Sequence, residues 1–481
     1  MEDPVEVYRV VLPWESDSKR NLNNRRIAIL PFANISPDPN DDYFADGLTD
    51  EMIHVLSQMR ELEVIARTSV MHYKNSEKKI KTIGKELNVG SVLEGSVRKS
   101  GKKIRVTAQL INSDTEIHEW SGSYDRELDD IFAIQSDIAK QIAGVLQVKL
   151  LKTEAARVEQ KATESVDAYT IYLKAGQSMH ERTPKAVREA MRLLQEAIDL
   201  DPRFSRAYAS MSSCYSILLD YGQISASEAL PKAREYGRMA LGIDQNLAEA
   251  HASVALAYDH DFDSVNAEKE YQQAISINPN LATAHHWYAV SLTGTGRNEE
   301  AIREMKKARD ADPLSPIIMT VVGSVYFQAG KYEEAWKQWE DTLKVEPGFF
   351  VLYLWRAIFH IKFSRYDEAK RELTRGLTFS PGHTRLLGVL GYAHAKKNDT
   401  AAARDVLENL LEARESDFVA GESISFVYAG LGERESFIEW LSIAVKERTV
   451  SNYLLRSLPM FDPFREDPEF KKLLREAKIE S

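Results

Sequence analysis

A fixed spacing of 34 residues runs through the second half of the sequence and constrains the fold more than any other feature. Prolines recur at this interval, each directly after an Asn, Asp, Glu or Ser, at Pro279, Pro313, Pro347 and Pro381. Because proline cannot continue a helix, each of them marks the end of a helical stretch. Self-similarity at such a period is typical of a stack of identical supersecondary units.

Two further sets of residues repeat with the same interval and indicate what each unit contains. One set predicts a tight turn inside the unit and comprises Gly296, Gly330, Ser364, Asn398 and Gly432. The other places a small residue five positions after each turn, at Ala267, Ala301, Ala335, Ala369 and Ala403. A small residue at this point lets a second helix approach the first, so we expect each unit to be a helical hairpin.

These units resemble the tetratricopeptide repeat over residues 167–449. In the unit that begins at Ala282, the large-to-small contacts of that family fall on His285, Tyr288, Ala289, Leu292, Ala301, Met305 and Ala308. The resemblance implies an all-α solenoid of about eight hairpins, of which the outer ones depart from the pattern; Phe437, for example, stands where a small residue is usual. We expect residues 450–481 to form the polar-faced terminal cap that such stacks need.

Residues 25–150 follow a different pattern, which predicts a small α+β domain. RIAILPF (residues 26–32) and ELEVIART (61–68) are predicted as strands, and residues 91–125 alternate between apolar and polar with two turn signals, which indicates a three-stranded meander. With the helices predicted between and after them, the order is βαβαβββα and the sheet is mixed. Residues 151–166 carry no clear apolar stripe and are predicted to be a linker, where limited proteolysis should cut first.

The α+β segment resembles the domain related to the amino-terminal part of TolB, through ILPFANIS, YFADGLTDEM and IGKELNVGSVLEGSVRKSG. In bacterial proteins this domain commonly precedes tetratricopeptide repeats, downstream of a class III nucleotidyl cyclase, a winged-helix domain or a kinase. The tail formed by residues 1–24 opens with EDPVEVYRVVLPWE, which resembles the end of a class III cyclase domain. The resemblance implies that the metal-binding and nucleotide-binding residues of a cyclase lie outside this chain.

Charge, hydropathy and motifs narrow the function classes. A formal net charge of -11 opposes the counterion release that drives nucleic-acid binding, and no apolar stretch has the length of a membrane span. We expect a cytoplasmic protein, in keeping with its single cysteine, Cys214.

The sequence motifs that could indicate an active site do not fit one. GSVLEGSVRKSGKK lacks the GK[ST] of a phosphate loop. His285 and His286 are adjacent in the sequence, so they cannot point from the same helix face toward one metal ion. We therefore predict no catalytic residue, no metal site and no cofactor.

The expected binding surface is the concave side of the central repeats, which the first helix of each hairpin lines in this family. The residues predicted to line this groove are His286, Val290, Phe327, Leu354, Ile358 and Tyr392. The helix FFVLYLWRAIFHIKF from Phe349 is apolar nearly all round, which indicates either a groove for an apolar partner or burial by the protein itself, within a tight superhelix or in a homodimer.

The sequence thus predicts a non-catalytic scaffold for protein–protein interaction and regulation, in which the groove binds a protein or peptide and the α+β domain is a sensor or adaptor. Two alternatives stay open. The chain could be the regulatory C-terminal portion of a class III adenylate cyclase, or a small-ligand sensor whose α+β domain binds the ligand while the repeats transmit the signal.

Overall fold

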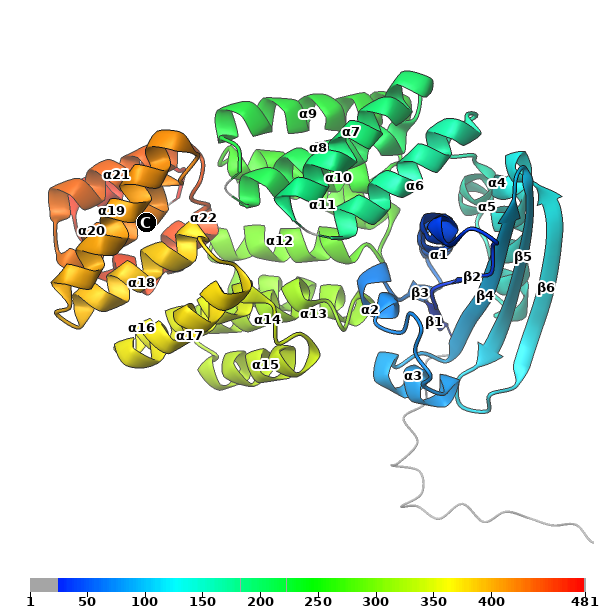
Figure 1. The fold of residues 1–481 in the computed structure, drawn as a ribbon, viewed down its shortest axis with the longest axis horizontal. Coiled ribbons are helices and arrows are strands. Elements are labelled where there is room, and N and C mark those ends of the chain that lie inside the picture. The colour runs from blue at the N-terminus through cyan, green and yellow to red at the C-terminus, as the bar shows by residue number, and fades with distance from the viewer. Residues whose placement is uncertain (1–24, 182, 222, 480–481) are drawn as a thin grey trace, which may run out of the picture.

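A small α+β part lies at one end of a long, curved array of helices (Figure 1). The structure is a computed structural model that describes residues 25–181, 183–221 and 223–479; the predicted tail 1–24 lies outside the described residues. None of the described helices is long and apolar enough to cross a membrane. The predicted fold class, a mixed-sheet α+β domain followed by an all-α solenoid, is confirmed.

The sheet has the strand order β3-β1-β4-β5-β6, with a short strand β2 that also pairs with β4. Its strands are β1 (Arg26–Ile29), β2 (Ala33–Asn34), β3 (Glu63–Val64), β4 (Ser91–Ser100), β5 (Lys103–Asn112) and β6 (His118–Glu127). β1 pairs in parallel with β3 and β4, and β4, β5 and β6 form the predicted antiparallel meander. The first hairpin turns at Gly101, whose φ of +60° suits glycine.

The helices of this part cover both faces of the sheet, since one group packs on Ile27 and Leu93 and another on Ala28 and Val92; the chain then leads into the repeats (Figure 1). These helices are η1 (Pro39–Asp41), α1 (Asp42–Ser57), α2 (Arg67–Met71), α3 (Ile80–Leu87), η2 (Leu128–Asp130), α4 (Ile131–Val145) and α5 (Lys152–Glu159). The expected linker 151–166 contains α5, in which Glu154 and Val158 are buried. This segment therefore packs against the α+β part and is not an open connection.

The strand predicted within residues 61–68 is present but shorter than expected, because only Glu63–Val64 is strand and α2 begins at Arg67. Contacts distant in sequence hold the start of this helix. Asp312, from a loop between repeats, accepts a hydrogen bond from the backbone N–H of Ser69 at 3.0 Å, and Ala66 N–H donates to the carbonyl of Ala311 at 2.8 Å. Asp312 thus satisfies an N-terminal amide of α2 as a capping side chain would, although it lies in the solenoid.

In the part of the chain that the structure describes, eight successive helix pairs form the solenoid. The first four are α6 (Val166–His180) with α7 (Pro184–Leu200), α8 (Ser205–Asp220) with α9 (Ala226–Ile243), α10 (Ala248–His260) with α11 (Ser264–Ile277), and α12 (Ala282–Gly294) with α13 (Asn298–Ala311). The next four are α14 (Pro316–Gln328) with α15 (Tyr332–Val345), α16 (Phe350–Lys362) with α17 (Tyr366–Phe379), α18 (Thr384–Lys396) with α19 (Thr400–Ser416), and α20 (Gly421–Leu431) with α21 (Arg434–Lys446). A terminal segment follows, with α22 (Asn452–Ser457), η3 (Pro459–Phe464) and α23 (Pro468–Glu476).

The three predicted sets of repeating residues have distinct physical roles. All five turn residues, including Ser364 and Asn398, have a positive φ between 56° and 81°, the left-handed conformation that lets the chain reverse between two helices. All five alanines of the second set are 0% exposed, as expected where two helices meet. The prolines each follow a helix C-cap residue, such as Asn278 and Asp312.

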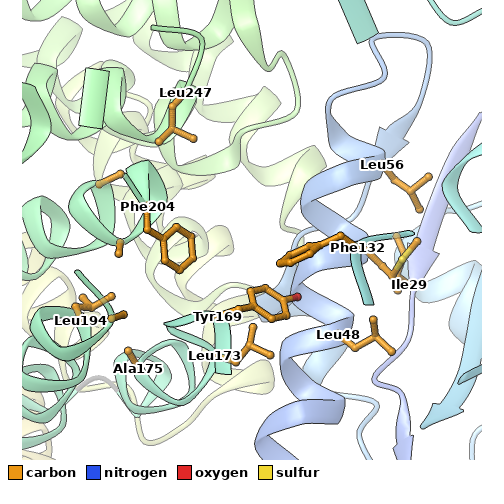
Figure 2. Packing of buried hydrophobic residues seen from close by; sticks show 14 of the residues in the cluster. Ile29, Leu48, Leu56, Phe132, Tyr169, Leu173, Ala175, Leu194, Phe204 and Leu247 are labelled. Atoms are coloured by element: carbon orange, nitrogen blue, oxygen red, sulfur yellow. The ribbon is translucent and has the colours of Figure 1, made fainter. Parts of the chain in front are cut away.

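One hydrophobic cluster continues from the α+β part into the first repeats. Figure 2 shows Phe132 of α4 and Leu48 of α1 facing Tyr169 and Leu173 of α6. The rings of Phe132 and Tyr169 lie 4.7 Å apart, and a methyl group on Gly47 would lie 2.8 Å from Leu173. At these contacts the packing leaves no room for solvent.

Polar contacts from the loops between repeats surround this shared core. Asn280 donates to the carbonyl of Leu62 at 2.6 Å, and Asn278 donates to the hydroxyl of Ser57 at 3.1 Å. Arg60 donates in the other direction, to the carbonyl of Ser276 at 3.0 Å. These loops between repeats lie along one edge of the solenoid, which thus supplies a series of polar partners for the α+β part.

We predict that the α+β part and the first repeats unfold together. Phe132→Ala should lower the free energy of unfolding by about 3–5 kcal/mol, since it empties a packed position in the shared core. Hydrogen exchange should then show loss of protection in both β4–β6 and α6–α10. The control, Phe379→Ala, removes a ring that is 46% exposed and should have a much smaller effect.

A different exchange pattern would show that the two parts unfold independently. If Phe132→Ala exposes the sheet to exchange while the repeats keep their protection, the two parts are independent units. Limited proteolysis should in that case cut within residues 151–166 first.

Candidate partner-binding groove

The six residues predicted to line the groove all come from the first helices of successive hairpins. His286 and Val290 lie on α12, Phe327 on α14, Leu354 and Ile358 on α16, and Tyr392 on α18. Five of these side chains are nevertheless almost inaccessible, with exposed fractions of 9% for His286, 4% for Phe327, 6% for Leu354, 2% for Ile358 and 4% for Tyr392. Val290 is partly buried. The expected exposed apolar patch is therefore covered.

Phe327 is buried within the repeats, where its ring packs against Tyr332, Trp339 and Phe359. The inner face of the repeats is covered by the C-terminal segment of the same chain (Figure 1). Tyr453 packs its ring 5.5 Å from that of Trp355, and a methyl group on Gly294 of α12 would lie 3.1 Å from its backbone nitrogen. Lys362 of α16 pairs with Asp462 at 3.0 Å. Leu455, Leu458, Met460 and Phe461 of the segment are each 1% exposed or less, so the segment is anchored by apolar burial.

Phe437 explains how the segment is held at its far end. It occupies the position where the other repeats have an alanine, and its ring stacks on Phe464 at 4.0 Å. Phe461 and Phe470 pack beside it at 5.8 and 6.3 Å. The departure from the repeat pattern therefore marks the last hairpin, which packs against the terminal segment where another repeat would otherwise continue.

The sequence pattern of residues 450–481 predicts a polar-faced cap and does not predict their position against the inner face of the repeats. The available signal was the apolar density of LRSLPMFDPF from Leu455, which exceeds the need of a cap that faces solvent. Burial by the protein itself, the alternative left open for the α16 helix, agrees with the structure. Binding of a partner at the six residues stays a prediction.

His285 of α12 is buried and has hydrogen-bond partners at both ring nitrogens. His285 contacts the carboxylate of Glu304 through Nδ1 at 2.6 Å and the carbonyl of Pro279 through Nε2 at 2.9 Å, so its ring joins three elements of one repeat. Within the described residues, no group of three or more histidine, cysteine or acidic side chains is arranged to hold a metal ion. Burial raises the pKa of the Cys214 thiol to about 12, which leaves the thiol protonated and unreactive.

The carboxyl group of Asp259 has a shifted pKa. It lies near the end of α10 and accepts hydrogen bonds from the hydroxyls of Ser291 at 2.7 Å and Tyr271 at 2.9 Å. Burial raises its pKa to about 6, although both hydrogen bonds act in the opposite direction. Its charged form is therefore disfavoured in the folded chain.

Comparison with known proteins identifies the two parts separately. Residues 23–140 match the family described as the second domain of HilA/YgeH-like transcriptional regulators, and residues 289–348 match the tetratricopeptide repeat family. The helical hairpins of the solenoid are therefore tetratricopeptide repeats.

Relatives extend these matches over longer stretches. The putative adenylate cyclase 3 of Rhizobium meliloti (strain 1021) is 36% identical over 48% of this chain and 40% of its own length. The transcriptional regulator HilA of Salmonella typhimurium is 23% identical over 34% of this chain and 30% of its own length. The chain thus spans less than half the length of these relatives. A structure of a monomeric IFIT1 mutant with Gppp-AAAA covers 90% of this chain and 95% of its own, with 12% identity and a TM-score of 0.51, which shows a similar fold alone.

We predict that Leu354→Glu and Ile358→Glu each destabilise the protein. A carboxylate placed in this covered face has no partner, and its desolvation should cost several kcal/mol. Thermal unfolding followed by circular dichroism should show a large drop in Tm. Lys337→Glu, which introduces the same group on an exposed position of α15, is the control and should leave the Tm nearly unchanged. A normal Tm for both groove variants would mean that the face is open in solution.

We also predict a specific pH dependence from Asp259. Because its folded-state pKa is raised from 3.8 to about 6, its contribution to stability is fully present below 3.8 and is lost as the pH rises through about 6. Asp259→Asn keeps the shape and has no proton to lose. Denaturant unfolding across this range should show that the wild type loses stability relative to Asp259→Asn as the pH rises. Parallel curves would contradict the raised pKa.

Proposed function

We propose that this chain is a non-catalytic module for protein–protein interaction and regulation. The observation that supports it best is the solenoid of tetratricopeptide repeats, an architecture whose curved inner face is commonly used to bind partners. The α+β part, which shares a core with the first repeats, would be the sensor or adaptor attached to this binding surface.

The binding surface in this proposal is the inner face around His286, Leu354 and Tyr392. A protein or peptide partner reaches this face only when the C-terminal segment moves away, because that segment covers it. The partner would then replace apolar contacts such as those of Leu455 and Phe461 with its own. A short segment held at one end of a solenoid can open locally at a lower free energy than global unfolding.

A second candidate is the regulatory C-terminal portion of a class III adenylate cyclase. It is favoured by the 36% identity to a putative adenylate cyclase, of which this chain spans 40%. In that arrangement catalysis would belong to a domain outside the chain, and the module described here would act on it. The two proposals agree that the described residues hold no nucleotide-converting site.

Partner capture with a loosened C-terminal segment tests the proposal. Tyr453→Ala removes the ring that packs on Trp355, so the segment should open more often. A partner is first identified by cross-linking to the tagged wild-type chain. Tyr453→Ala should then capture more of this partner than the wild type does, and Lys337→Glu should capture the same amount as the wild type. Cross-links should map to the inner face of α12–α18.

Two outcomes would contradict the proposal. Equal capture by the wild type and Tyr453→Ala would mean that no partner uses the inner face. Sustained formation of cyclic nucleotide from ATP or GTP with magnesium or manganese, abolished by substitutions within residues 25–150, would mean that the chain is itself an enzyme.

A further inference from the structure

A cavity of about 100 Å³ lies where the α+β part meets the second and third repeats. Its walls come from α1 and α4 on one side and from α8 and the start of α10 on the other. Figure 2 shows two of its apolar lining residues, Phe132 of α4 and Leu247 before α10, on opposite sides of the junction. Pockets between two packed parts of a chain are frequent ligand sites.

The polar wall of this cavity is built mainly from one face of α1. Glu51, His54 and Gln58 follow each other at helical spacing. Glu51 forms an ion pair with Arg206 of α8 at 2.6 Å, and His54 Nδ1 contacts Glu249 of α10 at 3.1 Å. Each contact crosses from the α+β part to the repeats.

Two acceptor oxygens of this wall lack a hydrogen-bond donor among the residues that the structure describes. They are Oε1 of Glu51 and Oε1 of Gln58, and both atoms are buried. Glu51 is only 2% exposed as a whole, so bulk water does not solvate it. A buried carboxylate oxygen without a donor is costly, and the donor is therefore expected to come from a molecule inside the cavity.

The charge of the wall indicates which kind of donor fits. Nε2 of Gln58 lies 2.7 Å from Nε2 of His54, so the amide nitrogen of Gln58 already has a partner, whereas its oxygen has none among the described residues. Arg206 pairs with Oε2 of Glu51, and the second oxygen of this carboxylate, Oε1, has no donor among the described residues. A carboxylate oxygen forms its strongest hydrogen bonds with charged N–H donors, so Oε1 of Glu51 favours a cationic donor.

The rim of the cavity is basic and already engaged. Arg157 donates to the carbonyl of Ile277 at 3.5 Å, and Lys161 pairs with Glu164 at 3.0 Å. Asp244 lies on the same rim. A ligand with an ammonium group toward Glu51 could therefore carry either a neutral or an anionic group toward the rim.

We propose that this cavity binds a small molecule that carries a protonated primary amine, with its N–H groups donated to Glu51 and Gln58. A water molecule occupies about 30 Å³ in the liquid, so the cavity has room for only a few non-hydrogen atoms. The inference goes beyond the proposed scaffold function. A ligand at this position touches α1 and the repeats together, so its binding would stabilise the docked arrangement of the two parts.

The test compares small molecules of matched size and different charge on the full chain. Ethanolamine and glycine both carry the ammonium group, and glycine adds a carboxylate, whereas ethylene glycol replaces the ammonium by a hydroxyl. Ethanolamine, glycine or both should raise the Tm and give saturable binding by calorimetry. Ethylene glycol at the same concentration should do neither. The stronger of the two amines shows whether the rim binds an anionic group.

Two variants locate the effect. Glu51→Gln should weaken amine binding by about tenfold or more, since it removes the charge from the hydrogen bond. Val55→Leu keeps every charge and fills space, because Val55 lines the cavity, so it should abolish binding without loss of fold. Glu77→Gln removes a carboxylate from an exposed position of the same part and should bind as the wild type does.

Several results would overturn the assignment. Equal Tm shifts from ethylene glycol and the amines, or no shift from either amine, would show that water alone occupies the cavity. Unchanged binding by Val55→Leu would place the amine elsewhere. If Glu51→Gln does not fold, the Val55→Leu result decides. None of these results bears on partner capture at the inner face, so the amine-binding proposal and the scaffold proposal can fail separately.

Discussion

The close approach of the two helices in every hairpin is the contact on which the remaining structure depends. Each of the five alanines from Ala267 to Ala403 is fully buried, and larger groups of the neighbouring helices fill the space around it. Gly323 shows how little room is left, since a methyl group there would lie 2.3 Å from Nε1 of Trp339. A stack of units packed in this way curves steadily, because each pair is related to the next by the same small rotation.

That curvature decides which distant segments meet. It brings the C-terminal segment back to α12, more than 150 residues earlier in the chain, where Arg456 lies beside Gly296. It also aligns the loops between repeats along one edge, where Asn278, Asn280 and Asp312 contact the α+β part. Asn278 and Asp312 are also the C-cap residues that precede the prolines of the repeat. Each of these two loops therefore both ends a repeat helix and contacts the α+β part.

The two parts meet through an apolar core on one side and a charged cavity on the other. Phe132 illustrates the boundary, since it packs on Tyr169 and also lines the cavity that holds Glu51. Burial of the apolar core provides most of the attraction between the parts, whereas the Glu51–Arg206 and His54–Glu249 contacts fix their relative position. A signal that changes this junction could therefore reach the repeats directly, without a flexible linker between the parts.

The sequence by itself determined the repeating unit, because the period of 34 residues, the turn residues and the alanines are all set by contacts within one hairpin or between neighbours. Gly296 and Ala301, for instance, have the conformations and burial that their spacing predicts. It also indicated the mixed sheet, whose meander follows from local alternation. Only the tertiary structure decided that Arg67–Met71 is a helix, that Leu354 and Ile358 are covered, and that Glu51 faces a cavity. Each of these features depends on residues far away in the sequence. The helix Arg67–Met71 depends on Asp312, the covered face of α16 on Phe461, and the position of Glu51 on Arg206. A pattern of local spacing carries no information about such contacts, because the curvature that creates them accumulates over all the repeats together.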